Sequence, residues 1–242
     1  MIKIENTEVV GWEHAIRGCR NPMNSWDRSD SCFCEDCANR DKDLCRQQAL
    51  DIGKNDHDLM MRLANGGSVH AKYRRMITVY CDITAPLYWW KEFDTYKVGT
   101  VANSCSTMHK IHEKEFTMED FSCEHLFDRD ANYEDTFDLF NSDGVNSECC
   151  PTEFMKMICG ILNFYRRRYL ETKDKKYWWQ MIQLLPSSYN QRRTIMLNYE
   201  VLANIFEYRK SHKLDEWVEF CKWIEILPYS EIITGETSKE DH

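Results

Sequence analysis

The sequence predicts an α+β protein with a small central sheet and a predominantly helical C-terminal half. The 242 residues include only 9 Gly and 5 Pro, which is little for a many-turned β-sandwich. Residues 75–84 alternate apolar and polar side chains, as a half-buried strand does. From Pro151 onward the pattern is helical, with stops at Pro186 and Pro228.

The N-terminal half contains shorter predicted elements. Residues 1–10 are typical of a strand, and a short helix is expected near Glu13–Arg17. Asn55 is expected to cap the next helix, which ends at the Gly66–Gly67 pair. Pro86 then takes the first position of an aromatic helix.

Four helices are predicted in the C-terminal half. Thr152 is expected to cap the first, whose apolar stripe is Phe154, Ile158, Ile161 and Tyr165. The second ends at Pro186. The third and fourth are expected at about residues 191–210 and 214–227.

Composition limits the classes of protein. We expect one domain over residues 1–234, with a Cys-rich segment at 19–45, an acidic insertion at 119–148 and a flexible tail at 235–242. The formal charge of −9 argues against a general nucleic-acid binder. The sequence has no apolar run of membrane-spanning length and no signal-peptide pattern, so a cytoplasmic protein is expected.

The 12 cysteines are expected to be reduced thiols or metal ligands. Cys81, Cys159 and Cys221 stand in apolar runs, as core residues do, whereas Cys32, Cys34, Cys37 and Cys45 fall within 14 residues. Four thiolates can close a tetrahedral zinc site, although this spacing is not a standard paired knuckle. A structural zinc and free thiols on a surface loop both remain open.

Residues 85–109 mix large rings with hydroxyl, amide and lysine groups. Tyr96, Lys97, Asn103 and Ser106 belong to this mixture. Such a combination suits a planar ligand that carries phosphates. An amphipathic helix followed by a polar loop explains it equally, and no GxGxxG or P-loop pattern is present.

Asn198 and Arg209 form a second candidate pair. They are 11 residues apart, which on a helix leaves them about 20° from each other, on one face. The pair can present an amide and a guanidinium to a long ligand. Alternatively, Arg209 only complements the C-terminus of its own helix.

These residues resemble the motifs of the flavin-dependent thymidylate synthases. In that family Arg-His-Arg is followed by Ser and then by a segment similar to Ser-Thr-Arg-Tyr. The corresponding segments here are Thr95-Tyr96-Lys97 with Thr100, and Ser106-Thr107-Met108-His109. The similarity spans roughly residues 55–110 and 185–227. It extends to Ala85-Pro86, the turn from Gly67 to His70, the Leu-Pro at 185–186, Asn198, Arg209, His212 and Glu216.

The resemblance implies roles for particular residues. It makes Ser106 the catalytic residue, near the reactive face of a pyrimidine deoxynucleotide such as dUMP, with Tyr96, Lys97 and Arg209 as substrate-binding residues. It assigns His70, Asn103 and Asn198 to the cofactor FAD. NADPH and methylenetetrahydrofolate are implied as co-substrates of an FAD-dependent methyltransferase, and a homotetramer as the assembly.

The positions at which this sequence departs from the family motif support an alternative function. Thr95, Tyr96 and Lys97 replace the Arg-His-Arg triplet, and Met108 stands where the family has a phosphate-binding arginine. Methionine cannot replace the two charge-assisted bonds of a guanidinium. A catalytically inactive nucleotide-binding or protein-interaction scaffold of the same fold, with or without a structural zinc, therefore remains the alternative.

Overall fold

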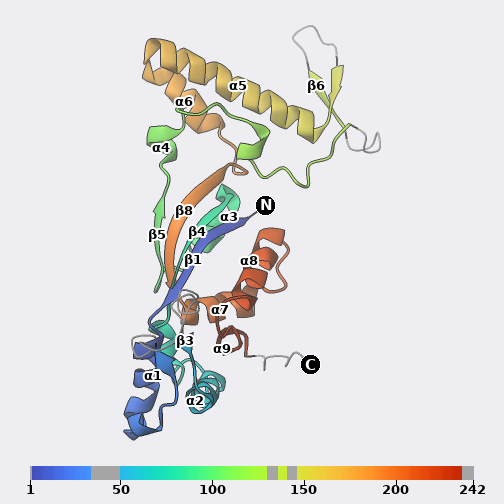
Figure 1. The fold of residues 1–242 in the computed structure, drawn as a ribbon. Helices are drawn as coiled ribbons and strands as arrows, with labels where there is room; N and C mark the ends of the chain where they lie inside the picture. Colours follow the sequence, from blue (N-terminus) through green and yellow to red (C-terminus); the bar gives the residue numbers. More distant parts are fainter. Residues whose placement is uncertain (1, 34–49, 130–135, 141–145, 236–242) are drawn as a thin grey trace, which may run out of the picture. The chain divides into compact units, whose positions relative to one another are not determined.

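A four-stranded sheet is the main β structure of the computed structural model, which describes residues 2–33, 50–129, 136–140 and 146–235 (Figure 1). The strand order is β1-β4-β8-β5. The strands are β1 (Lys3–Val10), β4 (Thr78–Pro86), β5 (Val101–Ser104) and β8 (Asn190–Asn198). Together with the helices they confirm the predicted α+β class.

Strand β4 has the alternation that its sequence predicts. Val79, Cys81 and Ile83 are buried, whereas Tyr80 is 41% exposed. Burial raises the pKa of the Cys81 thiol to about 12, with a further contribution from the nearby Asp82 carboxylate. Cys81 is therefore a protonated core residue at neutral pH and not a nucleophile.

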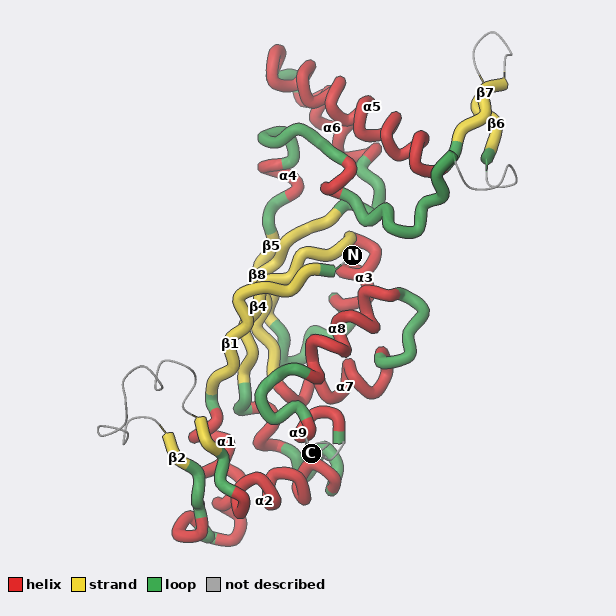
Figure 2. The backbone as a smooth tube through the Cα atoms, turned by 45° about the vertical axis from the view of Figure 1, so that its right-hand side comes forward, coloured by secondary structure: helices red, strands yellow, loops and turns green. Residues whose placement is uncertain are grey.

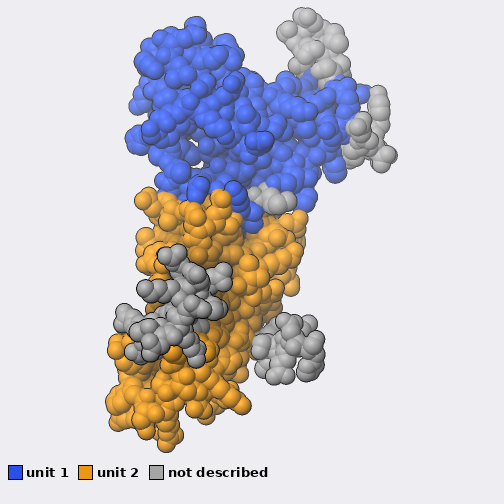
Figure 3. Space-filling view, in the orientation of Figure 1, with its two compact units in different colours: residues 1–3, 84–95, 104–193 blue, residues 4–83, 96–103, 194–242 orange. Residues whose placement is uncertain are grey.

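The chain divides into two compact units (Figure 3). Unit 1 comprises Met1–Lys3, Thr84–Thr95 and Ser104–Arg193. Unit 2 comprises Ile4–Ile83, Tyr96–Asn103 and Thr194–His242.

Unit 1 is built around α5 (Pro151–Thr172) and α6 (Lys175–Leu184), which pack side by side (Figures 1 and 2). Its core contains Ile111, Phe116, Phe121, Met155, Cys159, Leu162 and Met181. The elements of unit 1 outside the four-stranded sheet are α3 (Leu87–Phe93), α4 (Thr107–Lys110), η5 (Met118–Asp120), β6 (Phe137–Phe140), β7 (Asn146–Cys149), α5 (Pro151–Thr172) and α6 (Lys175–Leu184). Strands β6 and β7 pair antiparallel, with Phe137 opposite Cys149.

Unit 2 contains the remaining helices and a short antiparallel pair in which Cys32 lies opposite Asp51. Large side chains such as Tyr199, Trp217 and Phe220 are fully buried in it. Its elements outside the four-stranded sheet are α1 (Trp12–Arg20), η1 (Asn21–Met23), η2 (Trp26–Arg28), β2 (Cys32–Phe33), β3 (Leu50–Asp51), α2 (Lys54–Asn65), η4 (Lys72–Arg75), α7 (Tyr199–Arg209), α8 (Asp215–Glu225) and α9 (Glu231–Thr234).

The predicted third helix over 191–210 is wrong in its first half. Residues Asn190–Asn198 form strand β8, and the helix begins only at Tyr199. Ile195 and Leu197 are fully buried, two residues apart, which is the period of a strand. Short apolar runs of this kind do not by themselves distinguish a strand from a helix.

Two predicted helix caps are also wrong. Helix α2 begins after Gly53, two residues before the predicted cap Asn55. Helix α5 is capped by Cys150, whose sulfur accepts from the backbone N–H of Glu153 while the Glu153 carboxylate accepts from that of Cys150. This reciprocal capping box satisfies two N–H groups, so Thr152 lies inside the helix.

The apolar stripe predicted for α5 is partly right, since Ile158 and Tyr165 are partly buried and pack against the core. Met155, Cys159 and Leu162 are buried, whereas Phe154 and Ile161 are 41% and 44% exposed. Both sets have helical spacing, and only the packing of α5 against α6 decides which one faces the core.

Among the described residues, no helix combines the length and the hydrophobicity that crossing a membrane requires.

Candidate functional site

A pocket of about 630 Å³ in unit 2 is the candidate functional site. The beginning of α7 forms one wall, and the turn that contains Ser68, helix η4 and the loop at Val98–Gly99 complete it. Its polar lining residues are Ser68, Arg74, Arg75, Asn198, Glu200, Asn204, Glu207 and Tyr208. Side chains of α7 enter the pocket at helical spacing, because positions 200, 204 and 207 share one face of the helix.

Asn198 is held at the edge of this pocket by its role as a helix cap. Its backbone is extended, and its side-chain oxygen accepts from the N–H of Val201 at 3.1 Å. Gly99 lies against it with φ +81°, and a Cβ at Gly99 would be 2.8 Å from the Asn198 amide nitrogen. Both the backbone conformation and the close approach therefore require glycine at this position.

Arg74 supplies a buried positive charge at the pocket. It donates a hydrogen bond to the carbonyl of Ile232, and its guanidinium lies 3.8 Å from the carboxylate of Glu200. Its Nε has no hydrogen-bond partner among the described residues, although that atom is buried. An unpaired buried N–H is costly, and an acceptor oxygen of a ligand would remove this cost.

The structure brings Tyr96 and Arg209 together, although 113 positions separate them in the chain. Arg209 Nε donates to the Tyr96 hydroxyl at 2.9 Å, and its guanidinium stacks over the ring of Trp217 at 4.7 Å. Arg209 Nη1 is also 2.9 Å from His212 Nε2. These contacts hold the guanidinium rigidly against aromatic rings.

Asn198 and Arg209 do not act as a pair on one helix face. Asn198 precedes α7 with an extended backbone, so the helical spacing used to relate the two residues does not apply to it. Asn198 lines the pocket, whereas Arg209 is absent from its lining.

The other residues predicted for unit 2 lie on its surface. Lys97 is exposed in the loop before Gly99, and Asn103 is exposed on β5. His70 is exposed and lies two residues beyond the lining residue Ser68, without lining the pocket itself.

Ser106 belongs to unit 1 and lines a smaller pocket of about 180 Å³ with Lys110 and Arg192. Its hydroxyl oxygen accepts from the backbone N–H of His109 at 3.1 Å and so caps helix α4. Met108 is 51% exposed, two residues further along. The local role of Ser106 in the structure is that of a helix cap.

The predicted zinc ligands fall almost entirely outside the described residues. Cys34, Cys37 and Cys45 lie there, and Cys32 is an exposed free thiol. Among the described residues, no three His, Cys, Asp or Glu side chains are grouped as metal ligands.

Sequence reasoning overlooked most of the pocket wall that α7 provides. Glu200, Asn204, Glu207 and Tyr208 line the pocket but were not among the predicted site residues. The signal was present, because Asn204, Glu207 and Tyr208 follow Glu200 at the helical intervals of four, seven and eight residues. The prediction missed this pattern because it began the helix at residue 191 and not at Tyr199.

Neither a family model nor a curated protein matches the sequence. Similarity to known proteins is found in the three-dimensional fold. The fold is that of the flavin-dependent thymidylate synthases, as the sequence predicted.

Two solved structures illustrate this similarity. Thymidylate Synthase X (ThyX) from Helicobacter pylori, solved with FAD and dUMP, is 16% identical, with a TM-score of 0.61 over 96% of each chain. The UMP/dUMP methylase PolB from Streptomyces cacaoi, bound with 5-Br UMP, is 11% identical, with a TM-score of 0.58 over 97% of this chain and 95% of that chain.

Proposed function

We propose that this protein binds a flavin and a pyrimidine deoxynucleotide such as dUMP and modifies the pyrimidine ring. The observation that carries the proposal is the pocket beside Asn198. The sequence resemblance implies a flavin contact at Asn198, and the similar ThyX structure contains FAD and dUMP.

The lining residues suit a ligand of this chemistry. Arg74 and Arg75 offer guanidinium groups to a phosphate, and Arg74 has an unpartnered buried Nε among the described residues. Asn198 and Asn204 offer amides to ring edges, and the glycine at 99 allows the close approach of its backbone to Asn198. When bound, a reduced flavin supplies a hydride.

The chain's own residues would bind and orient the nucleotide. Lys97 is an exposed cation in the motif loop, and Arg209 is positioned by Tyr96 and Trp217. Ser106 is proposed to lie close to the reactive face of the pyrimidine. NADPH and methylenetetrahydrofolate as co-substrates, and assembly as a homotetramer, belong to the same proposal.

The proposal predicts that the protein takes up FAD and becomes yellow. The purified protein, incubated with FAD and desalted, is expected to show an absorbance peak near 450 nm. Replacing Arg75 with alanine should weaken FAD binding about tenfold or more, because one cation for the phosphates is lost. Lys72→Ala, on the same short helix but outside the pocket lining, is the matched control. A colourless wild-type protein after this incubation would reject the flavin proposal.

The second prediction concerns the nucleotide. Calorimetric titration of dUMP into Lys97→Ala and Arg209→Ala is expected to show a loss of about 30- to 1000-fold in affinity, the effect of removing a charged partner from a phosphate that is partly desolvated. Lys54→Ala removes the same charge from an exposed position elsewhere in unit 2 and should bind as wild type does. Unchanged affinity in both test variants would place the nucleotide elsewhere.

One observation favours a second function, that of a catalytically inactive scaffold. The position of the phosphate-binding arginine in the resembled motif is held by the exposed Met108. A protein that takes up neither FAD nor dUMP at millimolar concentration would support the scaffold and exclude the enzyme.

A further inference from the structure

A second and larger pocket lies in unit 2, between the segment that follows α1 and one face of α2. Its volume is about 980 Å³, within the range of small-molecule sites. Three arginines line it, Arg20, Arg28 and Arg62. None of the three is among the candidate site residues that the sequence predicted.

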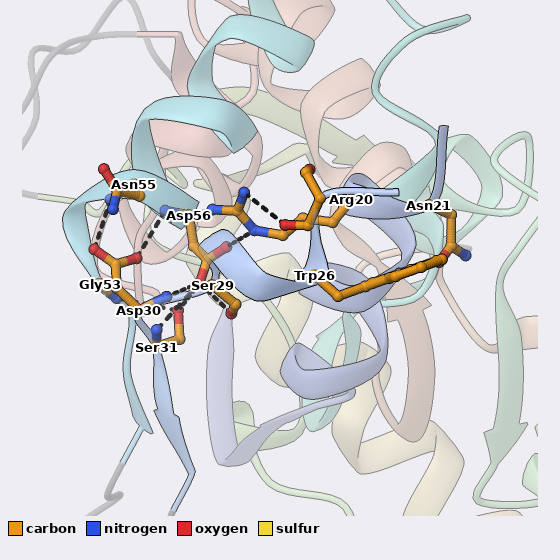
Figure 4. Close-up of polar contacts among 10 residues, drawn as sticks. Arg20, Asn21, Trp26, Ser29, Asp30, Ser31, Gly53, Asn55 and Asp56 are labelled. Atoms are coloured by element: carbon orange, nitrogen blue, oxygen red, sulfur yellow. Dashed lines mark hydrogen bonds and ion pairs between the residues drawn. The ribbon is translucent and has the colours of Figure 1, made fainter. Parts of the chain in front are cut away.

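Arg20 is fixed in place within this pocket lining (Figure 4). It is 4% exposed, its Nε donates to the carboxylate of Asp56 at 2.5 Å, and its Nη1 donates to the carbonyl of Ser25 at 3.3 Å. Its Nη2 is buried and has no hydrogen-bond partner among the described residues. The guanidinium is therefore preorganised and has an unused donor.

The other two arginines have donors to spare. Among the described residues, no side-chain hydrogen bond or ion pair is formed by Arg28, and Arg62 uses only its Nε, to the carbonyl of Asp58 at 3.3 Å. Guanidinium groups bind oxyanions through pairs of parallel N–H donors. Three of them around one pocket are notable in a protein with a formal charge of −9.

The nearby carboxylates are mostly engaged. Asp56 accepts hydrogen bonds from Arg20 and from the serine-rich segment before β2, and Asp30 accepts from the first N–H groups of α2. Among the residues that the structure describes, Asp58 contributes the single carboxylate to the pocket lining. The charged side chains of the pocket lining that remain available to bind a ligand are therefore predominantly cationic.

The pocket also has apolar lining residues. Met23, which is 81% exposed, lines it together with Leu59 and Met61. An inorganic ion would leave this apolar surface and most of the volume unused. A ligand with an organic body uses both.

We propose that this pocket binds a small organic phosphate, with its phosphate group held by Arg20, Arg28 and Arg62 and its organic body against the methionine and leucine side chains. This is a binding site separate from the proposed flavin pocket, since the two share no lining residue within the described part of the chain.

Calorimetric titration with pyrophosphate tests the phosphate subsite. The wild-type protein is expected to bind it, and the double variant Arg28→Ala/Arg62→Ala is expected to bind about tenfold or more weakly. Both side chains are exposed, and among the described residues neither forms a hydrogen bond or ion pair to another element, so the variant should remain folded. Circular dichroism and thermal unfolding check this directly.

The controls separate the alternatives. Arg17→Ala removes an exposed guanidinium of α1 that is outside the pocket lining and should bind pyrophosphate as wild type does. If Arg75→Ala abolishes the binding while Arg28→Ala/Arg62→Ala keeps it, the anion occupies the flavin pocket and the proposal is wrong. Binding of citrate in preference to pyrophosphate, with the same dependence on Arg28 and Arg62, would overturn the assignment to phosphate. No pyrophosphate binding by the folded wild-type protein would overturn the site altogether.

Discussion

Replacing Asp56 with alanine is expected to lower the free energy of unfolding by about 3–5 kcal/mol, the usual cost of removing one partner of a buried ion pair. Asp56 is 1% exposed and pairs with Arg20, which is itself buried. Its second carboxylate oxygen accepts from the hydroxyls of Ser29 and Ser31 at 2.7 Å each. The substitution leaves the Arg20 guanidinium uncompensated and these donors unpaired.

Chemical denaturation followed by circular dichroism measures this loss. Asp27→Ala removes the same charge from an exposed position in η2 and should change the stability by less than about 0.5 kcal/mol. Equal stability of Asp56→Ala and Asp27→Ala would show that the network of Figure 4 contributes nothing.

The same carboxylate makes a prediction about pH. Burial by itself would raise the pKa of Asp56, but hydrogen bonds from Ser31, Ser29 and Arg20 outweigh burial and hold the pKa below its ordinary value of 3.8. A pKa lowered by folding adds stability above the unfolded-state value, and this stability is lost as the pH falls through the folded-state value. The stability difference between wild type and Asp56→Asn should therefore shrink below about pH 4.

Replacing Trp90 with alanine is expected to cost about 3–5 kcal/mol, as for other large buried aromatic residues. Trp90 is fully buried in unit 1, its ring packs edge to face against Trp89 at 4.9 Å, and Arg193 stacks over it at 4.2 Å. Its indole N–H donates to the carbonyl of Gln191 at 2.8 Å. Alanine leaves a cavity and removes this hydrogen bond to a buried carbonyl.

Thermal unfolding compares this variant with Trp179→Ala, in which the replaced ring is 44% exposed. Trp90→Phe keeps a ring in the core and loses the hydrogen bond, so its loss of stability should be intermediate. A midpoint for Trp90→Ala within a degree or two of that for Trp179→Ala would contradict the assigned packing.

The burial of these rings changes the interpretation of the aromatic segment. From residue types alone, residues 85–109 suit a planar ligand as well as an amphipathic helix. Trp89, Trp90 and Phe93 are buried in the structure, as the amphipathic-helix interpretation expects.

The candidate site was only partly accessible to sequence reasoning. Asn198 was identified through the family resemblance, and the structure shows it as the cap at the start of α7. The contact between Tyr96 and Arg209 could not be derived from spacing, because 113 residues separate them. No local sequence pattern marks Arg74 or the three arginines of the second pocket as binding residues.

Local patterns determined much of the fold. The alternation in β4 and the apolar periodicity of α8 are each complete within a dozen residues, so β-strand and helix could be assigned from the sequence alone. The fold class followed from these elements together with the motif resemblance.

The tertiary structure decided the elements whose local sequence fits two alternatives, either a strand and a helix or two different buried faces of one helix. Residues 190–198 form a strand because β8 hydrogen-bonds to both β4 and β5, which lie beside it in the sheet order. Helix α5 turns Leu162 rather than Ile161 inward because α6 packs against that face. In both cases two conformations or two faces bury similar apolar area locally, and only partners distant in the chain supply the energy difference between them.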